Sequence, residues 1–243
     1  MRVLFSRPRT SGSGRRELIR CILFDLDGTL LDSYDAITES LNAARSAYGL
    51  PPFLRDDVVR RVGHGLESLI EEALGAERIA EGVRRFRERY RQISLFQSRL
   101  LPGVEGTVRE LRARGYRLAV ITNKPAVFSR SILDHLGVGD LFPVIYGPDL
   151  APAKPDPEMV FRALADLACV PADAILVGDM IVDRDTARNA GIPFYAVPTG
   201  SQTRGELLSA LPDALLDRFE DLLTLLPPLN SLQGPDQTPA AGS

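Results

Sequence analysis

Two aspartates, Asp25 and Asp27, follow an apolar run at 21–24 and are separated from the next apolar residues by Gly28 and Thr29. An apolar run of this length is typical of a buried strand, and Gly28 marks where the strand ends. Two acids and an exposed carbonyl group at such a strand end can supply the oxygen ligands that Mg²⁺ prefers. The same residues could instead form an ordinary Asp-Gly turn with no chemical role.

Three further groups of polar residues follow apolar runs later in the chain. They are Thr122 with Asn123 and Lys124, then Lys154, then Asp179 with Asp183. Because the carboxyl ends of parallel strands share one edge of a sheet, we expect these side chains to meet Asp25 and Asp27 there. Carboxylates, a hydroxyl, an amide and a cation together suit Mg²⁺-assisted phosphoryl transfer, with one carboxylate as the nucleophile.

Each group alone also has an ordinary structural explanation. Asp183 is well placed to cap a helix, and Thr122 with Asn123 could simply begin one. Lys154 precedes a proline and could belong to a rigid turn. All but two of the 29 basic residues are arginines, and both lysines follow predicted strands. This placement favours a site that needs a compact ammonium charge, although two residues could fall there by chance.

The elements that must position these residues alternate between strands and helices. Apolar runs predict strands at 21–24, 116–122, 142–146, 174–177 and 193–197, with a possible edge strand at 214–216. Helical patterns occupy 103–114, 125–136, 156–168, 183–190, 205–210 and 219–226. This alternation predicts an α/β fold with a doubly wound parallel sheet.

Residues 33–100 differ from the rest, because they show helical periodicity and no strand signal. The breaks between them predict about four helices, at 33–48, 55–62, 66–74 and 77–95. We therefore expect a helical cap domain at 33–100, inserted into an α/β core domain made of 20–32 and 101–226.

The two ends of the chain lack the patterns of folded protein. Residues 1–19 are predicted to be a disordered basic extension, too poor in apolar residues for a secretory signal. Residues 227–243, with Pro, Gly, Gln and Ser, are predicted to be a disordered tail.

The overall composition indicates a protein that binds neither nucleic acid nor a membrane, since the formal net charge is only −3. The 243 residues suffice for one good core and a smaller second unit. The two cysteines, Cys21 and Cys169, lie in apolar surroundings without motif spacing. We predict buried thiols, which suit a cytoplasmic location.

Taken in order, the four groups resemble the signature motifs of the haloacid dehalogenase superfamily. The matching stretches are Asp25-Leu26-Asp27-Gly28-Thr29-Leu30, Thr122-Asn123-Lys124, Lys154-Pro155 and Gly178-Asp179-x-x-x-Asp183. The helical insertion, together with Val62-Gly63-His64-Gly65 inside it, resembles the cap of the phosphoglycolate phosphatase-like branch. The resemblance covers about residues 20–226 and implies a Rossmann-like core with an α-helical cap.

The resemblance implies different tasks for the first two acids. Asp25 would attack phosphorus, form an aspartyl-phosphate and bind Mg²⁺. Asp27 would protonate the leaving alcohol and later take a proton from water, while its backbone carbonyl would bind the metal. The dehalogenase branch lacks a carboxylate at this second place, because a halide needs no proton, so Asp27 argues for phosphate chemistry.

The remaining motifs would bind the phosphoryl group and the metal. Thr122, the backbone N–H of Asn123 and Lys154 would hold the transferring phosphoryl group. Asp179 would bind Mg²⁺ directly, and Asp183 would do so directly or through water, or would fix Lys154.

Contacts with the distal end of the substrate are expected from Lys124 and Asn123, and a further contact from the cap loop. Gly63 and His64 would face the core from the cap, although His64 could equally be an exposed loop histidine. Met180 stands where this branch often has a small residue after the metal-binding aspartate.

The function predicted from these residues is a Mg²⁺-dependent phosphomonoesterase that acts on a small phosphorylated metabolite, with 2-phosphoglycolate as the first candidate. We expect a monomer or homodimer. A phosphosugar mutase of the β-phosphoglucomutase type, or a pyrophosphatase or nucleotidase of the same superfamily, would share this core.

Functions outside this superfamily fit the motifs less well. A phosphorelay receiver also combines Asp, Thr and Lys around Mg²⁺, but its acidic pair precedes the phosphorylated aspartate and it lacks a helical insertion. A purely binding protein would not need Asp25 and Asp27 together.

Overall fold

The computed structural model describes residues 18–229, so most of the predicted basic extension and of the predicted tail lies outside the described residues. The first residues of that tail contact the core. The Tyr116 hydroxyl donates to the Pro227 carbonyl at 2.8 Å, and the Leu229 N–H donates to the Arg114 carbonyl at 3.1 Å. Pro227 and Leu229 therefore contact the core.

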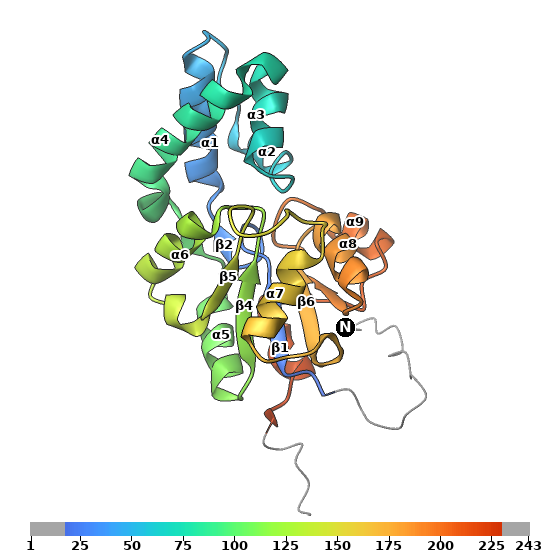
Figure 1. Ribbon diagram of the computed structural model, residues 1–243. Helices are drawn as coiled ribbons and strands as arrows, with labels where there is room; N and C mark the ends of the chain where they lie inside the picture. The colour runs from blue at the N-terminus through green and yellow to red at the C-terminus, as the bar shows by residue number, and fades with distance from the viewer. Residues whose placement is uncertain (1–17, 230–243) are drawn as a thin grey trace, which may run out of the picture.

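A six-stranded parallel sheet in the order β5-β4-β1-β6-β7-β8 lies at the centre of the core (Figure 1). Its strands are β1 (Cys21–Phe24), β4 (Arg117–Ile121), β5 (Val144–Tyr146), β6 (Ala174–Gly178), β7 (Phe194–Ala196) and β8 (Ala214–Leu215). Every neighbouring pair is parallel. The predicted α/β doubly wound fold is confirmed.

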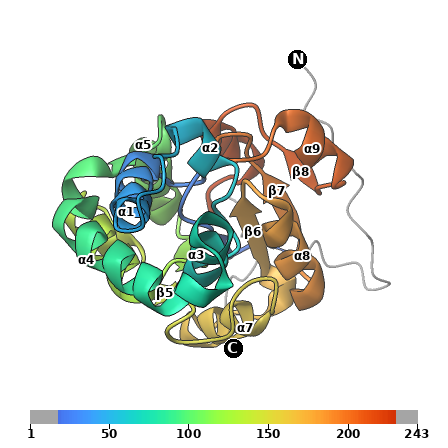
Figure 2. The ribbon, with the colours of Figure 1, turned by 90° about the horizontal axis from the view of Figure 1, so that it is seen from above.

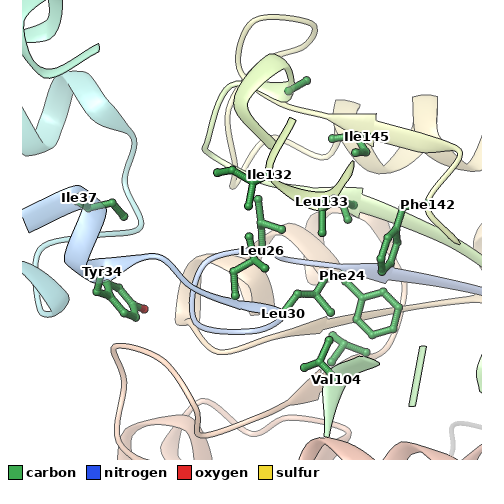
Figure 3. Close-up of a cluster of buried hydrophobic side chains, with 14 of the residues drawn as sticks. Phe24, Leu26, Leu30, Tyr34, Ile37, Val104, Ile132, Leu133, Phe142 and Ile145 are labelled. Atoms are coloured by element: carbon green, nitrogen blue, oxygen red, sulfur yellow. The ribbon is translucent and has the colours of Figure 1, made fainter. Parts of the chain in front are cut away.

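Helices cover both faces of this sheet, as the apolar character of its strands requires. On one face Ile22 and Phe24 of β1 pack in one core cluster. Figure 3 shows Phe24 in this cluster with Val104 and Phe142. On the other face Cys21 and Leu23 pack in a second cluster. The core helices are α5 (Val104–Ala113), α6 (Ala126–His135), α7 (Glu158–Asp166), α8 (Ile181–Ala190), α9 (Arg204–Ser209) and α10 (Leu222–Leu225).

Residues 33–100 form a helical unit that stands at one end of the core (Figure 1). Its helices are α1 (Tyr34–Ser46), α2 (Arg55–Val59), α3 (Leu66–Leu74) and α4 (Ile79–Gln97). Seen from above, α1, α3 and α4 lie over one side of the core and leave β6 and α8 in view (Figure 2). None of the helices within residues 18–229 is long and apolar enough to cross a bilayer.

Two short antiparallel strands, β2 (Leu31–Asp32) and β3 (Arg99–Leu100), carry the chain from the core to the helical unit and back. The sequence analysis missed this pair, because strands of two residues leave no alternating pattern. The pairing holds the entry and exit of the cap side by side, so both connections start from one point beside Asp27.

The prediction of two buried thiols is wrong, because Cys21 and Cys169 are joined by a disulfide bond. They are 148 residues apart in sequence, but β1 pairs with β6, which begins shortly after Cys169, and the two Cα atoms lie 6.6 Å apart. Apolar surroundings and spacing along the chain could not reveal this distance. The cysteines therefore give no argument for a reducing compartment.

Candidate active site

The polar residues that follow β1, β4, β5 and β6 meet at the carboxyl edge of the sheet, beneath the helical cap. Because β4, β1 and β6 are neighbours in the sheet, Thr122, Asp25 and Asp179 follow adjacent strands. The loop after β5 carries Lys154 to the same place. The buried polar residues here are Asp25, Thr122, Asn123, Lys154, Asp179 and Asp183.

Three of the predicted metal ligands form one buried acidic cluster. Asp25, Asp179 and Asp183 each offer a carboxylate oxygen within 4.8 Å of the others. The ammonium group of Lys154 donates to Asp25 Oδ1 at 2.7 Å and to Asp183 Oδ1 at 2.6 Å. Asp179 accepts hydrogen bonds from the Thr29 hydroxyl at 2.8 Å and from the Ser201 N–H at 3.1 Å. Such a set of oxygen atoms could hold a divalent cation.

The electrostatics of this cluster favour a bound cation. Burial raises the pKa of Asp179 well above its ordinary value, and the Asp25 and Asp183 carboxylates raise it further. Burial also raises the pKa of Asp183 to about 6, although the Lys154 ammonium opposes the rise. Burial disfavours the charge on Lys154, but the Asp183 and Asp25 carboxylates outweigh it and raise the pKa of Lys154. The Lys154 ammonium is thus the one positive side chain bonded to this cluster of three described carboxylates, which leaves an excess of negative charge.

The carboxylate of Asp27 lies apart from this cluster, on the side that faces the cap. It accepts a hydrogen bond from Lys124 Nζ at 2.6 Å and another from the Ser33 hydroxyl at 2.5 Å. Burial disfavours the charge on Lys124, but the Asp27 carboxylate outweighs it and raises the pKa of Lys124. Asp25 and Asp27 are therefore held by different lysines in different surroundings.

Lys124 and Ser33 thus have contacts that the sequence analysis did not foresee. Lys124 lines the cavity, and its ammonium group pairs with Asp27. The predicted contact with the distal end of a substrate stays a prediction. Lysine is scarce in this chain, and Lys124 was predicted to be functional for that reason. Its partner Asp27 is 97 residues away in sequence, so only the fold shows the pairing. Ser33 carried no signal of its own, because a single serine at a helix start is common.

The side chain of Asn123 joins the cap to the loop that carries Lys154. Its amide nitrogen donates to the Gly63 carbonyl at 2.9 Å and to the Lys154 carbonyl at 3.2 Å. Its amide oxygen accepts from the Lys154 N–H at 2.8 Å. Asn123 also lines the cavity, and its predicted contact with substrate stays a prediction.

The predicted cap-loop residues take different places. Gly63 lines the cavity over the acidic cluster and lies against Met180, since a Cβ atom on Gly63 would sit 2.3 Å from the end of that side chain. His64 is exposed and is not among the residues that line the cavity. The side chain of Met180 therefore reaches Gly63 in the cap. The small residue that is usual at this position would be too short for this contact.

A cavity of about 80 Å³ lies between the strand ends and the cap. Asp25, Asp27, Thr122, Lys124 and Lys154 line its core side. The cap side is lined by Ile37, Val62, Gly63, Gly65, Leu66, Leu69, Phe86 and Tyr90. Polar groups that can act on a phosphoryl group thus face a largely apolar roof.

The loop after β7 also supports the site, and the sequence analysis missed it. The Thr199 hydroxyl donates to the Gly28 carbonyl at 2.7 Å. Gly28 has φ +89°, and a Cβ atom there would lie 2.6 Å from Asp179 Oδ2 and 2.8 Å from the Gly200 Cα. Only glycine combines this backbone conformation with this close approach.

Replacing Gly28 by alanine should therefore destabilise the protein by about 3 kcal/mol or more, because strain and collision with backbone add up. Gly137→Ala is the matched control, since Gly137 also has a positive φ, +71°, but open space around it. We expect that variant to lose only about 1 kcal/mol. Chemical denaturation measures both, and equal losses would contradict the close packing of Gly28 against the loop 199–201.

Comparisons with known proteins find similarity across the core and the cap alike. A family model described as haloacid dehalogenase-like hydrolase matches residues 22–197. The chain is 34% identical over 209 residues to the phosphoglycolate phosphatase of Aquifex aeolicus, covering 86% of this chain and 97% of the relative. It is 37% identical over 187 residues to the phosphoglycolate phosphatase of Cereibacter sphaeroides, covering 74% and 85%.

Two solved structures extend the comparison to the fold. A predicted phosphoglycolate phosphatase of Haemophilus somnus is 29% identical, with a TM-score of 0.80 and coverage of 87% of this chain and 99% of that one. A variant of CbbY from Rhodobacter sphaeroides, in complex with xylulose-1,5-bisphosphate, is 28% identical with a TM-score of 0.73, covering 86% and 99%. The similarity therefore includes the cap that roofs the cavity.

Proposed function

This chain belongs to the haloacid dehalogenase-like hydrolases as a phosphoric monoester hydrolase, and we propose that it works with Mg²⁺ through an aspartyl-phosphate on Asp25. The observation that carries this proposal is the separation of the two acids. Asp25 lies in a buried cluster with Lys154, Asp179 and Asp183. Asp27 is held apart by Lys124. One carboxylate is thus set up to attack and the other to move a proton.

In the first step an oxygen of Asp25 attacks phosphorus, and the bond from phosphorus to the alcohol oxygen breaks. Asp27 gives its proton to that oxygen, so the alcohol leaves neutral. The hydroxyl of Thr122, the backbone N–H of Asn123 and the ammonium of Lys154 hold the phosphoryl oxygens. Mg²⁺ held by Asp25, Asp179 and Asp183, with the Asp27 carbonyl, would neutralise charge on the phosphoryl group.

In the second step water attacks the aspartyl-phosphate and loses a proton to Asp27. Phosphate leaves, Asp25 regains its free carboxylate and Asp27 regains its proton. The hydrogen bonds from Lys124 and Ser33 keep the Asp27 carboxylate aimed at one place during both transfers. Only a group that can take and return a proton serves here.

The substrate proposed first is 2-phosphoglycolate, because the curated relatives carry that name at 34–37% identity. A phosphosugar mutase is the second candidate, since a similar structure holds a sugar bisphosphate. The predicted cytoplasmic location, and the predicted monomeric or dimeric state, stay predictions.

The deciding experiment incubates the protein with Mg²⁺ and 2-phosphoglycolate, sugar phosphates, nucleotides or pyrophosphate, and measures released phosphate. We expect release from small phosphate monoesters. Interconversion of a hexose phosphate without phosphate release would favour the mutase. Folded protein that releases phosphate from none of these substrates would overturn the proposed function.

The stability of the metal-free protein should depend on pH through the buried carboxyl groups of Asp183 and Asp179. The pKa of Asp183 rises from 3.8 to about 6, and that of Asp179 is also raised. Between about pH 4 and 6 the folded, metal-free chain therefore binds more protons than the unfolded chain. By linkage, the contribution of these groups to stability falls as the pH rises through that window.

Mg²⁺ should relieve this repulsion, so it should raise the melting temperature more at about pH 7.5 than at about pH 5, where protons compete for the same carboxylates. Thermal unfolding of chelator-treated protein, with and without Mg²⁺, measures the difference. NaCl at equal ionic strength is the control. An equal gain at both pH values would contradict metal binding by Asp179 and Asp183.

A further inference from the structure

The hydroxyl group of Tyr90 is buried in the roof of the cavity beside the Lys124 ammonium and the Ser33 hydroxyl, which act on its oxygen as donors, and no described residue accepts its proton. Tyr90 lies on α4 and is 1% exposed. Its ring stacks on Phe86 with centroids 5.4 Å apart and meets Phe128 edge-on at 5.3 Å. The ring is therefore held from the cap and from the core, and the hydroxyl cannot turn out to solvent.

Phenylalanine would fill the same space without this cost. A buried hydroxyl whose proton has no acceptor loses the hydrogen bond that it donates to water in the unfolded chain and gains none in its place. Such groups are uncommon in folded proteins and call for an explanation. Since Tyr90 lines the cavity, a bound molecule is a natural source of the missing acceptor.

Among the described cap residues that line the cavity, only Tyr90 has a polar atom in its side chain. The other side chains of the roof are aliphatic or aromatic: Ile37, Val62, Leu66, Leu69 and Phe86. A molecule in the cavity can therefore form a side-chain hydrogen bond to the roof at a single point. That point can select one substrate over another.

The position of Tyr90 places this point beside the proton-transferring acid. Lys124 Nζ lies 5.2 Å from the centroid of the Tyr90 ring and is bonded to Asp27. The leaving alcohol must lie next to Asp27, so its substituents lie near Tyr90. Burial raises the pKa of Tyr90, the Lys124 ammonium opposes the rise, and the net shift is upward. The hydroxyl thus keeps its proton and can donate it.

The cavity also limits the size of the leaving alcohol. Its volume of about 80 Å³ is small beside the roughly 300–1,000 Å³ of pockets for larger ligands. Met180 on the core side and Gly63 on the cap side lie in contact and help to set this small volume. A short alcohol suits this space.

We propose that Tyr90 is a specificity residue whose hydroxyl donates a hydrogen bond to a second oxygen of the leaving alcohol. The preferred substrates are then phosphate monoesters of short alcohols that carry a carboxylate or a hydroxyl close to the ester oxygen. This inference rests on the proposed function and narrows its substrate class.

Three substrates of similar size test the proposal: 2-phosphoglycolate, 2-hydroxyethyl phosphate and ethyl phosphate. Beyond the ester oxygen, the alcohol part of 2-phosphoglycolate carries a carboxylate and that of 2-hydroxyethyl phosphate carries a hydroxyl. Ethyl phosphate has no further oxygen there that could accept a hydrogen bond from Tyr90. For the wild type with Mg²⁺, we expect kcat/KM for the better oxygen-bearing substrate to exceed that for ethyl phosphate at least about 10-fold. Which of the two is better identifies the acceptor.

Tyr90→Phe should lower kcat/KM about 10- to 100-fold for the preferred substrate and leave ethyl phosphate within about 2-fold of the wild type, so that the preference is lost. The matched control is Tyr116→Phe, which removes a buried hydroxyl that bonds to Pro227 far from the cavity. That variant should be less stable and should keep the wild-type preference.

Two results would overturn the role of Tyr90 while phosphatase activity stands. One is an equal kcat/KM of the wild type for ethyl phosphate and for the other two substrates. This comparison needs no variant, so it decides even if Tyr90→Phe does not fold. The other is a folded Tyr90→Phe variant that loses activity equally on all three. Hydrolysis of none of the broader set of phosphate esters would instead overturn the proposed function, and this inference with it.

Discussion

Replacing Asp25 by asparagine should lower phosphate release by at least on the order of 10³-fold while the melting transition stays close to that of the wild type. The amide is a poor nucleophile, so the aspartyl-phosphate cannot form. The fold should tolerate the change for an electrostatic reason. Asp25 is one of three buried carboxylates, and Lys154 keeps its 2.6 Å contact with Asp183 when the charge on Asp25 is removed.

Steady-state phosphate release and thermal unfolding measure the two halves of this prediction. Asp57→Asn is the control, because Asp57 pairs with Arg60 on the surface of the cap and should affect neither quantity. Mass spectrometry of acid-quenched protein during turnover should find a phosphoryl group on the wild type and none on the variant. Retained activity in Asp25→Asn would show that another residue is the nucleophile.

Replacing Lys154 by methionine should destabilise the protein by about 3 kcal/mol or more at neutral pH and cause a severe loss of activity. The side chain of Lys154 is 1% exposed, and its ammonium group bonds to Asp25 and Asp183. Methionine has a similar length but no charge, so three carboxylates would remain buried without their cation. Leaving buried charge unpaired costs far more than losing a surface pair.

The loss should shrink at low pH, which distinguishes this cause from poor packing of methionine. Protonation removes the unpaired charge, and Asp183, with a pKa of about 6 even beside Lys154, should accept a proton more readily without it. Denaturation at about pH 5 and pH 7.5 measures the difference. The control Arg162→Met removes an exposed pair with Glu158 and should change little. A loss that is the same at both pH values would contradict the electrostatic explanation.

Asp25 and Lys154 form one hydrogen-bonded pair, but the two replacements should have different effects on stability. Asp25→Asn removes the nucleophile and relieves repulsion, whereas Lys154→Met removes the cation and increases it. Activity should fall in both, but stability should fall only in the second. This contrast follows from counting buried charges and does not depend on the identity of the substrate.

Much of this protein follows from its sequence, because strands and helices leave patterns in the local order of apolar residues. The alternation along the chain predicted the doubly wound sheet, and the break at 33–100 predicted the helical unit above it. Parallel strands present their carboxyl ends at one edge. The proximity of Asp25, Thr122, Lys154 and Asp179 was therefore predictable from topology alone.

What the tertiary structure decided is which groups are partners once they share that edge. The sequence analysis could not foresee that Lys124 pairs with Asp27, that Asn123 bonds to Gly63, or that Cys21 lies beside Cys169. Such contacts depend on distances across the sheet and between the cap and the core. Nothing in local periodicity encodes them.

Tyr90 shows the same limit most clearly. In the sequence it is one aromatic residue on the apolar side of a long helix, and its spacing predicts only burial. The position of α4 over the strand ends places Tyr90 in the lining of the cavity, with no described acceptor for the proton of its hydroxyl. The amino-acid sequence determined the fold and which polar groups share the carboxyl edge of the sheet, because these depend on local pattern and strand order. The packing of the cap against the core decided which cap side chains line the cavity, because that depends on how two separate helical and sheet surfaces fit together.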